Sequence, residues 1–93
     1  MATSLRTFRL GTHQSIAYTG TAGSTAAFSV GIQAARIFAT TSCFVKVASA
    51  AVATSSDVPL AANTSEIVTV QEGEKVSAIQ VGGAGTLHVT ELT

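Results

Sequence analysis

The stretch CFVKVAS at residues 43–49 carries the pattern that decides the fold. Cys43, Val45 and Val47 share one face of an extended chain, because successive side chains of a strand point to opposite faces. The residues between them point the other way, and they include a lysine. This alternation is typical of a β-strand with one buried face. We therefore expect a strand here.

Similar runs rich in Val, Ile, Thr and Phe lie on both sides, separated by Gly, Ser, Asn and Asp. Such runs and breaks predict short strands joined by turns. The expected strands cover residues 4–10, 14–18, 27–32, 36–40, 43–49, 66–71, 76–81 and 86–92. In two of them the shared faces are clear: Phe28 with Val30, and Ile37 with Ala39.

One segment could instead form a helix, namely GIQAARIF at residues 31–38. It lacks a good cap and is bounded by β-branched residues, so a strand is favoured. About eight short strands at intervals of roughly 8 to 12 residues indicate an all-β fold, as an antiparallel β-sandwich, a jelly roll or a small barrel. Because 93 residues suffice for one domain, residues 1–93 are expected to form a single β-sandwich domain.

Two connections are expected to be loops. Residues 19–25 read TGTAGST and should be flexible, since they are too small and polar to pack. Residues 50–65 break the alternation and contain Pro59, so they predict a long excursion with room for a short edge segment. Within QEGEK, a turn should centre on Gly73.

Residues 81–88 read VGGAGTLH and resemble a phosphate-binding loop at first sight. Such a loop needs a helix N-terminus behind it, usually with Lys and Ser or Thr. Here the strand-like TLHVTEL follows, and no GK[ST] is present. The glycines therefore predict a β-hairpin turn with positive φ between the last two strands.

The composition is poor in charge. Charged residues make up 11% of the chain and the formal net charge is zero, whereas ordinary soluble domains contain about 25% charged residues. Solubility usually depends on a charged surface, so part of this surface should be covered in the working state. We therefore expect a homo-oligomer or a docked subunit.

Neither nucleic acid nor a membrane is an expected partner. Nucleic-acid binding needs clustered basic residues, and here they are scattered: Arg6, Arg9, Arg36, Lys46 and Lys75. The uncharged segment 10–35 is interrupted by polar side chains and glycines, so it lacks the apolar run of about 20 residues that a membrane span requires. The N-terminal segment has no continuous apolar core of a secretory signal.

No catalytic, metal or cofactor site is expected, and we predict that the protein is not an enzyme. Cys43 is the only cysteine and should be a buried apolar residue. His13 is expected in a turn, and His88 should point away from the face that Leu87 and Val89 bury. Two histidines so far apart in sequence are weak evidence for a metal site.

The five carboxylate side chains are expected to be structural or exposed to solvent. Asp57 should order a turn through its side chain. Glu72 and Glu74 flank Gly73 and should be solvated, while Glu66 and Glu91 fall near strand ends.

From about residue 38 onward the sequence resembles small structural proteins of tailed bacteriophages. The pieces that carry the resemblance are a Cys-aromatic-Val strand, a T-x-x-D-x-P-L connection, an E-x-x-x-V-x-x-G-x-K-V-x-x-I segment and a terminal G-T-L-x-V-T-E. They lie at residues 43–47, 54–60, 66–79 and 85–91. The resemblance implies a capsid decoration, or cement, protein on the capsid surface of the virion. Its implied partners are the phage major capsid protein and other copies of itself, most often as a homotrimer.

Two alternatives stay open. One is another virion module of the same fold, in the head–tail connector, the tail or a fibre. The other is a small carbohydrate- or ligand-binding β-sandwich, although an aromatic sugar platform is poorly supplied because Trp is absent and Tyr18 is the only tyrosine. Partner contacts are expected in residues 1–3, 19–25 and 50–65, since long loops on a rigid sandwich often carry binding.

Overall fold

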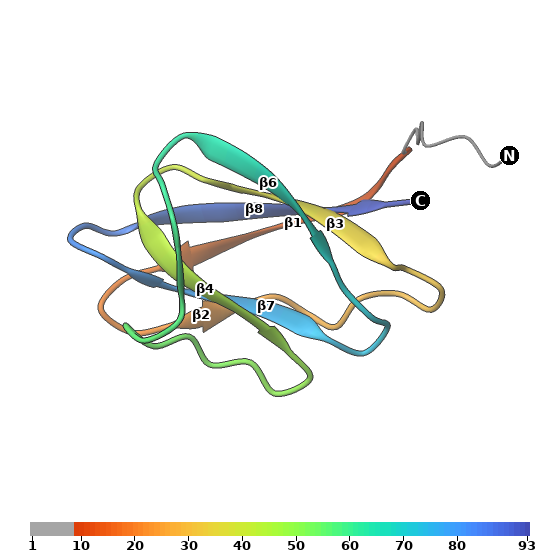
Figure 1. Ribbon diagram of the computed structural model, residues 1–93, viewed down its shortest axis with the longest axis horizontal. Coiled ribbons are helices and arrows are strands. Elements are labelled where there is room, and N and C mark those ends of the chain that lie inside the picture. The colour runs from red at the N-terminus through yellow and green to blue at the C-terminus, as the bar shows by residue number, and fades with distance from the viewer. Residues whose placement is uncertain (1–8) are drawn as a thin grey trace, which may run out of the picture.

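The computed structural model describes residues 9–93 as two packed antiparallel sheets (Figure 1). The strands are β1 (Leu10–Tyr18), β2 (Gly23–Ser24), β3 (Ala34–Ala39), β4 (Cys43–Ala48), β5 (Val58–Leu60), β6 (Thr64–Thr69), β7 (Lys75–Gln80) and β8 (Gly85–Leu92). Sheet A has the order β1-β8-β3-β6, and sheet B has the order β2-β7-β4-β5. The predicted all-β sandwich is confirmed, and residues 9–93 contain no helix that could cross a membrane.

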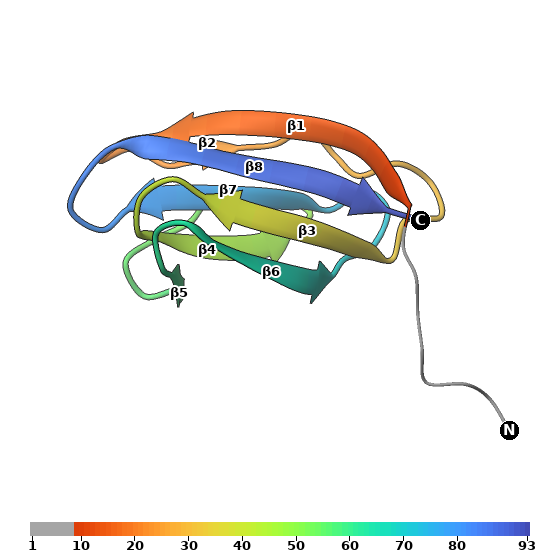
Figure 2. The ribbon, with the colours of Figure 1, turned by 90° about the horizontal axis from the view of Figure 1, so that it is seen from above.

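The strand order is that of a jelly roll. β1 pairs with β8, β2 with β7, β3 with β6 and β4 with β5, as in one long antiparallel ribbon that is rolled up into two sheets. β4 and β5 follow each other in the sequence and are hydrogen-bonded to each other. Every other pair of consecutive described strands is joined by a connection that crosses from one sheet to the other. Figure 2 shows sheet A from outside, with β1, β8, β3 and β6 side by side.

The core lies between the sheets and follows the alternation of the strands. Cys43 and Val45 of β4 are buried, as are Ile37 and Ala39 of β3. Lys46, which falls between Val45 and Val47, is exposed. The predicted faces of residues 36–40 and 43–49 are therefore confirmed, and the favoured strand within 31–38 is confirmed over the helix.

The N-terminal strand differs from the expectation. Residues 10–18 form one strand, β1, with a register shift between Leu10 and His13. The expected turn at His13 is therefore wrong, because pairing with β8 extends the strand through it. Most of the expected strand 4–10 and the expected contact segment 1–3 lie outside the described residues.

The expected strand 27–32 is also wrong. This segment crosses from sheet B to sheet A as an irregular connection, with positive φ at Gly31. Phe28 is buried, whereas Val30 is 88% exposed, so the two do not share a face. The apolar side chain of Phe28 covers the core from a connection between the sheets, and not from a strand within one of them.

The long excursion packs partly on its own domain. Ala51 and Ala53 are buried against the outside of sheet B. Ser77 of β7 accepts a hydrogen bond from the Ala53 N–H (2.9 Å) and donates one to the Gly23 carbonyl (2.8 Å). Residues 50–65 also contain β5, the edge segment for which the sequence left room. The part that covers sheet B is therefore not free for a partner.

The connection 19–25 is more ordered than its composition indicates, because it contains β2. Thr25 is buried, its N–H donates to the Val76 carbonyl (2.9 Å), and its hydroxyl accepts from the Val76 N–H (3.0 Å). The expectation that this segment does not pack is wrong. Small polar residues can be buried when the neighbouring backbone satisfies their hydrogen bonds.

The glycines at 82–85 do not close a hairpin. β7 lies in sheet B and β8 in sheet A, so residues 81–84 cross between the sheets. None of these glycines has positive φ; among the described glycines, it occurs at Gly31 and Gly73. Gly85 is required for space instead, since a Cβ there would lie 2.7 Å from the Tyr18 hydroxyl and 2.9 Å from the Thr40 hydroxyl.

Candidate functional site

The outer face of sheet A presents side chains from four strands, of which Thr90 and Leu92 are buried and the others are exposed or half-buried. Its side chains come from four strands and share the outward parity of the register: His13, Ser15, Ala17, Ala34, Arg36, Phe38, Ser65, Ile67, Thr69, Thr86, His88, Thr90 and Leu92. Most of them are small, and the larger ones other than Leu92 gather in the two middle rows. One row is His13–Thr90–Arg36–Ile67, and the next is Ser15–His88–Phe38–Ser65.

The two histidines meet on this face, although 75 positions separate them. His88 Nδ1 lies 3.4 Å from His13 Nε2. Their rings are stacked, with centroids 5.5 Å apart and planes inclined by 18°. His13 Nδ1 lies 2.8 Å from the Thr90 hydroxyl oxygen. His88 points away from the buried Leu87 and Val89, as expected.

The histidine stack continues into an aromatic and a cationic side chain of β3. The Phe38 ring lies 6.3 Å from the His88 ring, and the guanidinium carbon of Arg36 lies 5.8 Å from the Phe38 centroid. Among the described strand residues of this face, Arg36 carries the sole permanent charge, and none is acidic. The centre of the face is therefore aromatic and cationic, with Ser, Thr and Ala around it.

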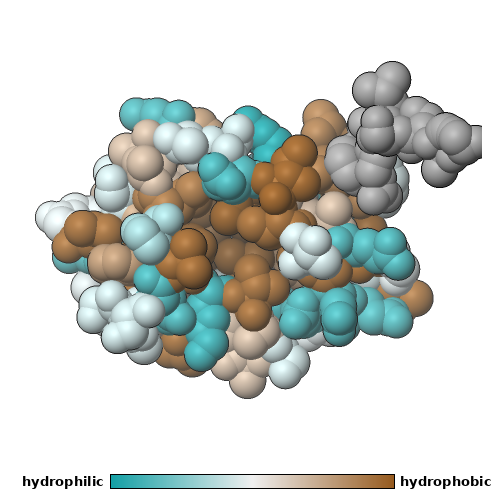
Figure 3. Space-filling model, viewed as in Figure 1, coloured by the Kyte–Doolittle hydropathy of each residue, from teal (hydrophilic) through white to brown (hydrophobic). Residues whose placement is uncertain are grey.

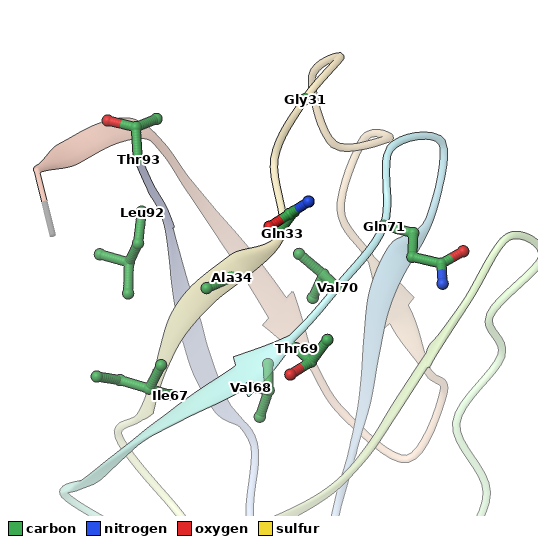
Figure 4. A pocket seen from close by; sticks show the side chains of 10 residues that line it. All are labelled: Gly31, Gln33, Ala34, Ile67, Val68, Thr69, Val70, Gln71, Leu92 and Thr93. Atoms are coloured by element: carbon green, nitrogen blue, oxygen red, sulfur yellow. The ribbon is translucent and has the colours of Figure 1, made fainter. Parts of the chain in front are cut away.

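A groove with a volume of about 540 Å³ lies at one corner of this face, beside the crossing at Gly31 (Figure 4). Ile67, Leu92 and Ala34 line it from three neighbouring strands, and Gln33 and Gln71 add amide groups. None of its lining side chains is acidic or basic. The groove offers apolar contact and hydrogen bonds but no group for acid–base chemistry.

A second opening lies between the sheets, at the edges formed by β5 and β6. This β5–β6 cleft has a volume of about 320 Å³, and Ile37, Val45, Leu60 and Val68 form its apolar wall. Figure 1 looks into this side of the sandwich, and Figure 3 shows apolar side chains gathered there. Glu66 is the sole charged side chain among the described residues that line the cleft.

The remaining candidate residues are structural. Cys43 is buried, and burial raises the pKa of its thiol above the ordinary value of 9.0, so the reactive thiolate is disfavoured. Asp57 accepts hydrogen bonds from the N–H (2.7 Å) and hydroxyl (3.2 Å) of Thr54, which confirms its predicted turn role. Glu74 similarly accepts from the Gln71 N–H (2.8 Å) at the Gly73 turn.

Glu91 is buried and hydrogen-bonded, a role that its position near a strand end did not predict. It lies near the end of β8 as expected, but it points inward and is 3% exposed. Its carboxylate accepts hydrogen bonds from the N–H (2.9 Å) and the hydroxyl (3.0 Å) of Ser29. The signal was its parity with Leu87 and Val89, which predicts an inward direction.

The part of the chain from residue 9 onward contains no group of three His, Cys, Asp or Glu side chains that could hold a metal ion. No protein-family model matches the chain, and comparisons with curated proteins and with solved structures also give no match.

Proposed function

We propose that this protein is a phage capsid decoration protein that binds the head shell through the outer face of sheet A and stabilises it by bridging neighbouring capsid subunits. The outer face of sheet A is the observation that carries the proposal. It combines an aromatic and arginine centre with a surround of small side chains, and it lacks carboxylates in the described strands.

This arrangement suits a protein–protein contact. Aromatic residues and Arg are enriched among the residues that dominate binding energy, and they concentrate near the centre of an interface. Small neighbours let the partner approach closely and exclude water from that centre. Few charges have to be desolvated on the face, which keeps the cost of burying it low.

The low overall charge and the resemblance of residues 38–93 to small phage structural proteins point in the same direction. A decoration protein acts in many identical copies, so contacts of modest strength add up over the shell. A subunit that binds the expanded shell more tightly than the unexpanded one stabilises the expanded state by mass action.

The test is co-sedimentation with expanded, DNA-free head shells of the tailed phage that encodes the chain. The wild-type protein should saturate at a fixed number of copies per shell. Arg36→Glu should abolish binding, because it inverts the central charge of the face. Lys46→Glu is the matched control, since it makes the same change on an exposed side chain of sheet B and should bind as wild type does. Equal binding by both variants would contradict the proposed surface, and no binding by the wild type would contradict the function.

A further inference from the structure

The edge of sheet A at β6 is unpaired in the described chain. β6 is hydrogen-bonded to β3 on one side, and no described strand pairs with its other side. The Val70 N–H donates to the Gln33 carbonyl (3.0 Å). Backbone groups of successive residues point to opposite sides of a strand, so this bond shows which residues of β6 face β3 and which face away from it. Backbone groups of Ser65, Ile67 and Thr69 therefore point toward the free edge. All three residues are exposed.

Free N–H and C=O groups along a strand are a template for a further strand. A strand added here would place every second side chain over the mouth of the β5–β6 cleft, because inward parity continues across a sheet. Along β6 that inward parity belongs to Thr64, Glu66 and Val68. The added strand should accordingly present a cation opposite the carboxylate and an apolar side chain two residues away.

A second copy of β6 does not meet this requirement. Two antiparallel β6 strands that keep their inward faces together place Glu66 opposite Glu66, Val68 or Thr64 of the other copy. The first register opposes like charges, and the second sets a carboxylate against a valine. The third pairs residues 64–66 alone and gives Glu66 no cation, so none of the three meets the requirement.

The segment SLRTF at residues 4–8 does meet it. By strand alternation Arg6 and Phe8 fall on one face. With Arg6 opposite Glu66, Phe8 lies beside Thr64 in an antiparallel pairing and beside Val68 in a parallel one, and both residues line the cleft. Charge and apolar character therefore match in either direction.

The same subunit cannot supply this strand to its own edge. Arg9 is fixed beside Thr93 at the β1 side of sheet A, since each N–H donates to the other's carbonyl (2.8 and 3.0 Å). From β1 to β6 there are three strand spacings, or about 14 Å at 4.8 Å each. Phe8 lies one Cα step of about 3.8 Å from Arg9, so it cannot reach its own β6.

We propose that residues 4–8 of one copy add a strand to the β6 edge of a neighbouring copy, with Arg6 paired to Glu66, and so assemble the chain into an oligomer. Such a head-to-tail contact closes into a ring when its rotation permits. The inference rests on the proposed function only for the biological use of the oligomer, because the assembly itself needs no shell.

Sedimentation velocity of the purified chain over a hundredfold concentration range tests this assembly. The full chain should form a discrete oligomer at high micromolar concentration. Removal of residues 2–8, Arg6→Glu and Glu66→Arg should each raise the dissociation constant about tenfold or more, as expected for the loss of a close charge pair. The combined Arg6→Glu and Glu66→Arg variant should restore assembly, because the pair is re-formed with the charges exchanged.

Matched controls are Arg9→Glu, which lies on the opposite parity from Arg6, and Glu72→Arg, which lies in an exposed turn. Both should assemble as wild type does, and a thermal melt of each variant should show that it is folded. A monomeric wild type, an oligomer that survives Glu66→Arg, or a charge-exchange variant that stays monomeric would overturn the inference. If the wild type is monomeric and binds shells, the inference is overturned and the proposed function stands. If the wild type forms the oligomer but does not bind shells, the proposed function is contradicted and the inference stands.

Discussion

Gly85→Ala should be far more damaging than the same change at the two glycines before it. A Cβ at Gly85 would meet the hydroxyls of Thr41, Tyr18 and Thr40. The Tyr18 hydroxyl donates to the Thr41 carbonyl (2.6 Å) and accepts from the Thr41 N–H (3.2 Å), and its ring is 1% exposed. The extra methyl therefore has to displace a buried, hydrogen-bonded group.

The magnitude follows from two contributions. Forcing a methyl into a packed site costs about 1–3 kcal/mol, and each hydrogen bond that is lost costs about 0.5–1.5 kcal/mol. We expect Gly85→Ala to lower the free energy of unfolding by about 2–4 kcal/mol. For a domain of this size the melting temperature should fall by about 10–30 °C.

Gly82→Ala and Gly83→Ala are the controls, because a Cβ at either position meets nothing within 4 Å and neither has positive φ. They should leave stability unchanged or raise it by up to about 1 kcal/mol, since alanine restricts the unfolded chain. Urea denaturation followed by circular dichroism measures all three. Tyr18→Phe combined with Gly85→Ala should cost less than the sum of the single changes, because the methyl and the hydroxyl occupy the same space. Equal stability of the three alanine variants would refute this reasoning.

Three further changes test the interior. Burial raises the pKa of the Cys43 thiol above its ordinary value of 9.0, so at alkaline pH the unfolded thiol loses its proton before the folded one does. The contribution of this thiol to the free energy of unfolding is therefore fully present below pH 9.0 and is lost as the pH rises above that value. Cys43→Ala should flatten that alkaline decline in urea denaturation between neutral pH and pH about 10, and an unchanged decline would contradict it. Glu91→Ala should lower the free energy of unfolding by about 1–3 kcal/mol, because it removes the two hydrogen bonds that the buried carboxylate accepts from Ser29. Glu72→Ala in an exposed turn should change it by less than about 0.5 kcal/mol. Ser77→Ala should speed hydrogen exchange of the Ala53 amide, whose hydrogen bond to the Ser77 hydroxyl it removes; unaltered exchange would mean that this bond does not hold residues 51–53 on sheet B.

The sequence predicts a strand correctly where the alternation of its own side chains defines it. The prediction is wrong where the structure of a segment depends on which strand it pairs with. Residues 36–40 and 43–49 show which side chains face the core, because that information lies within a few neighbouring positions. The partner of each strand is not local information. Glycine-rich residues 82–85 could close a hairpin or cross between sheets, and the jelly-roll order selects the crossing.

The candidate surfaces depend on the same non-local pairing. His13 and His88 come together because β1 and β8 pair, and the sequence gives no sign of that contact. Phe38 and Arg36 share a face by parity, which the sequence could have shown. The free edge of β6 can be recognised only in the finished sheet. It exists because no described strand pairs with that side of β6.

The proposed function requires the chain to be part of a tailed-phage particle, and an electron-cryomicroscopy reconstruction of such a particle tests it most directly. Copies of the sandwich should lie on the outside of the head, with the outer face of sheet A, including Arg36 and Phe38, against the capsid subunits. Copies in the tail or the connector, or particles without the protein, would contradict the proposed function.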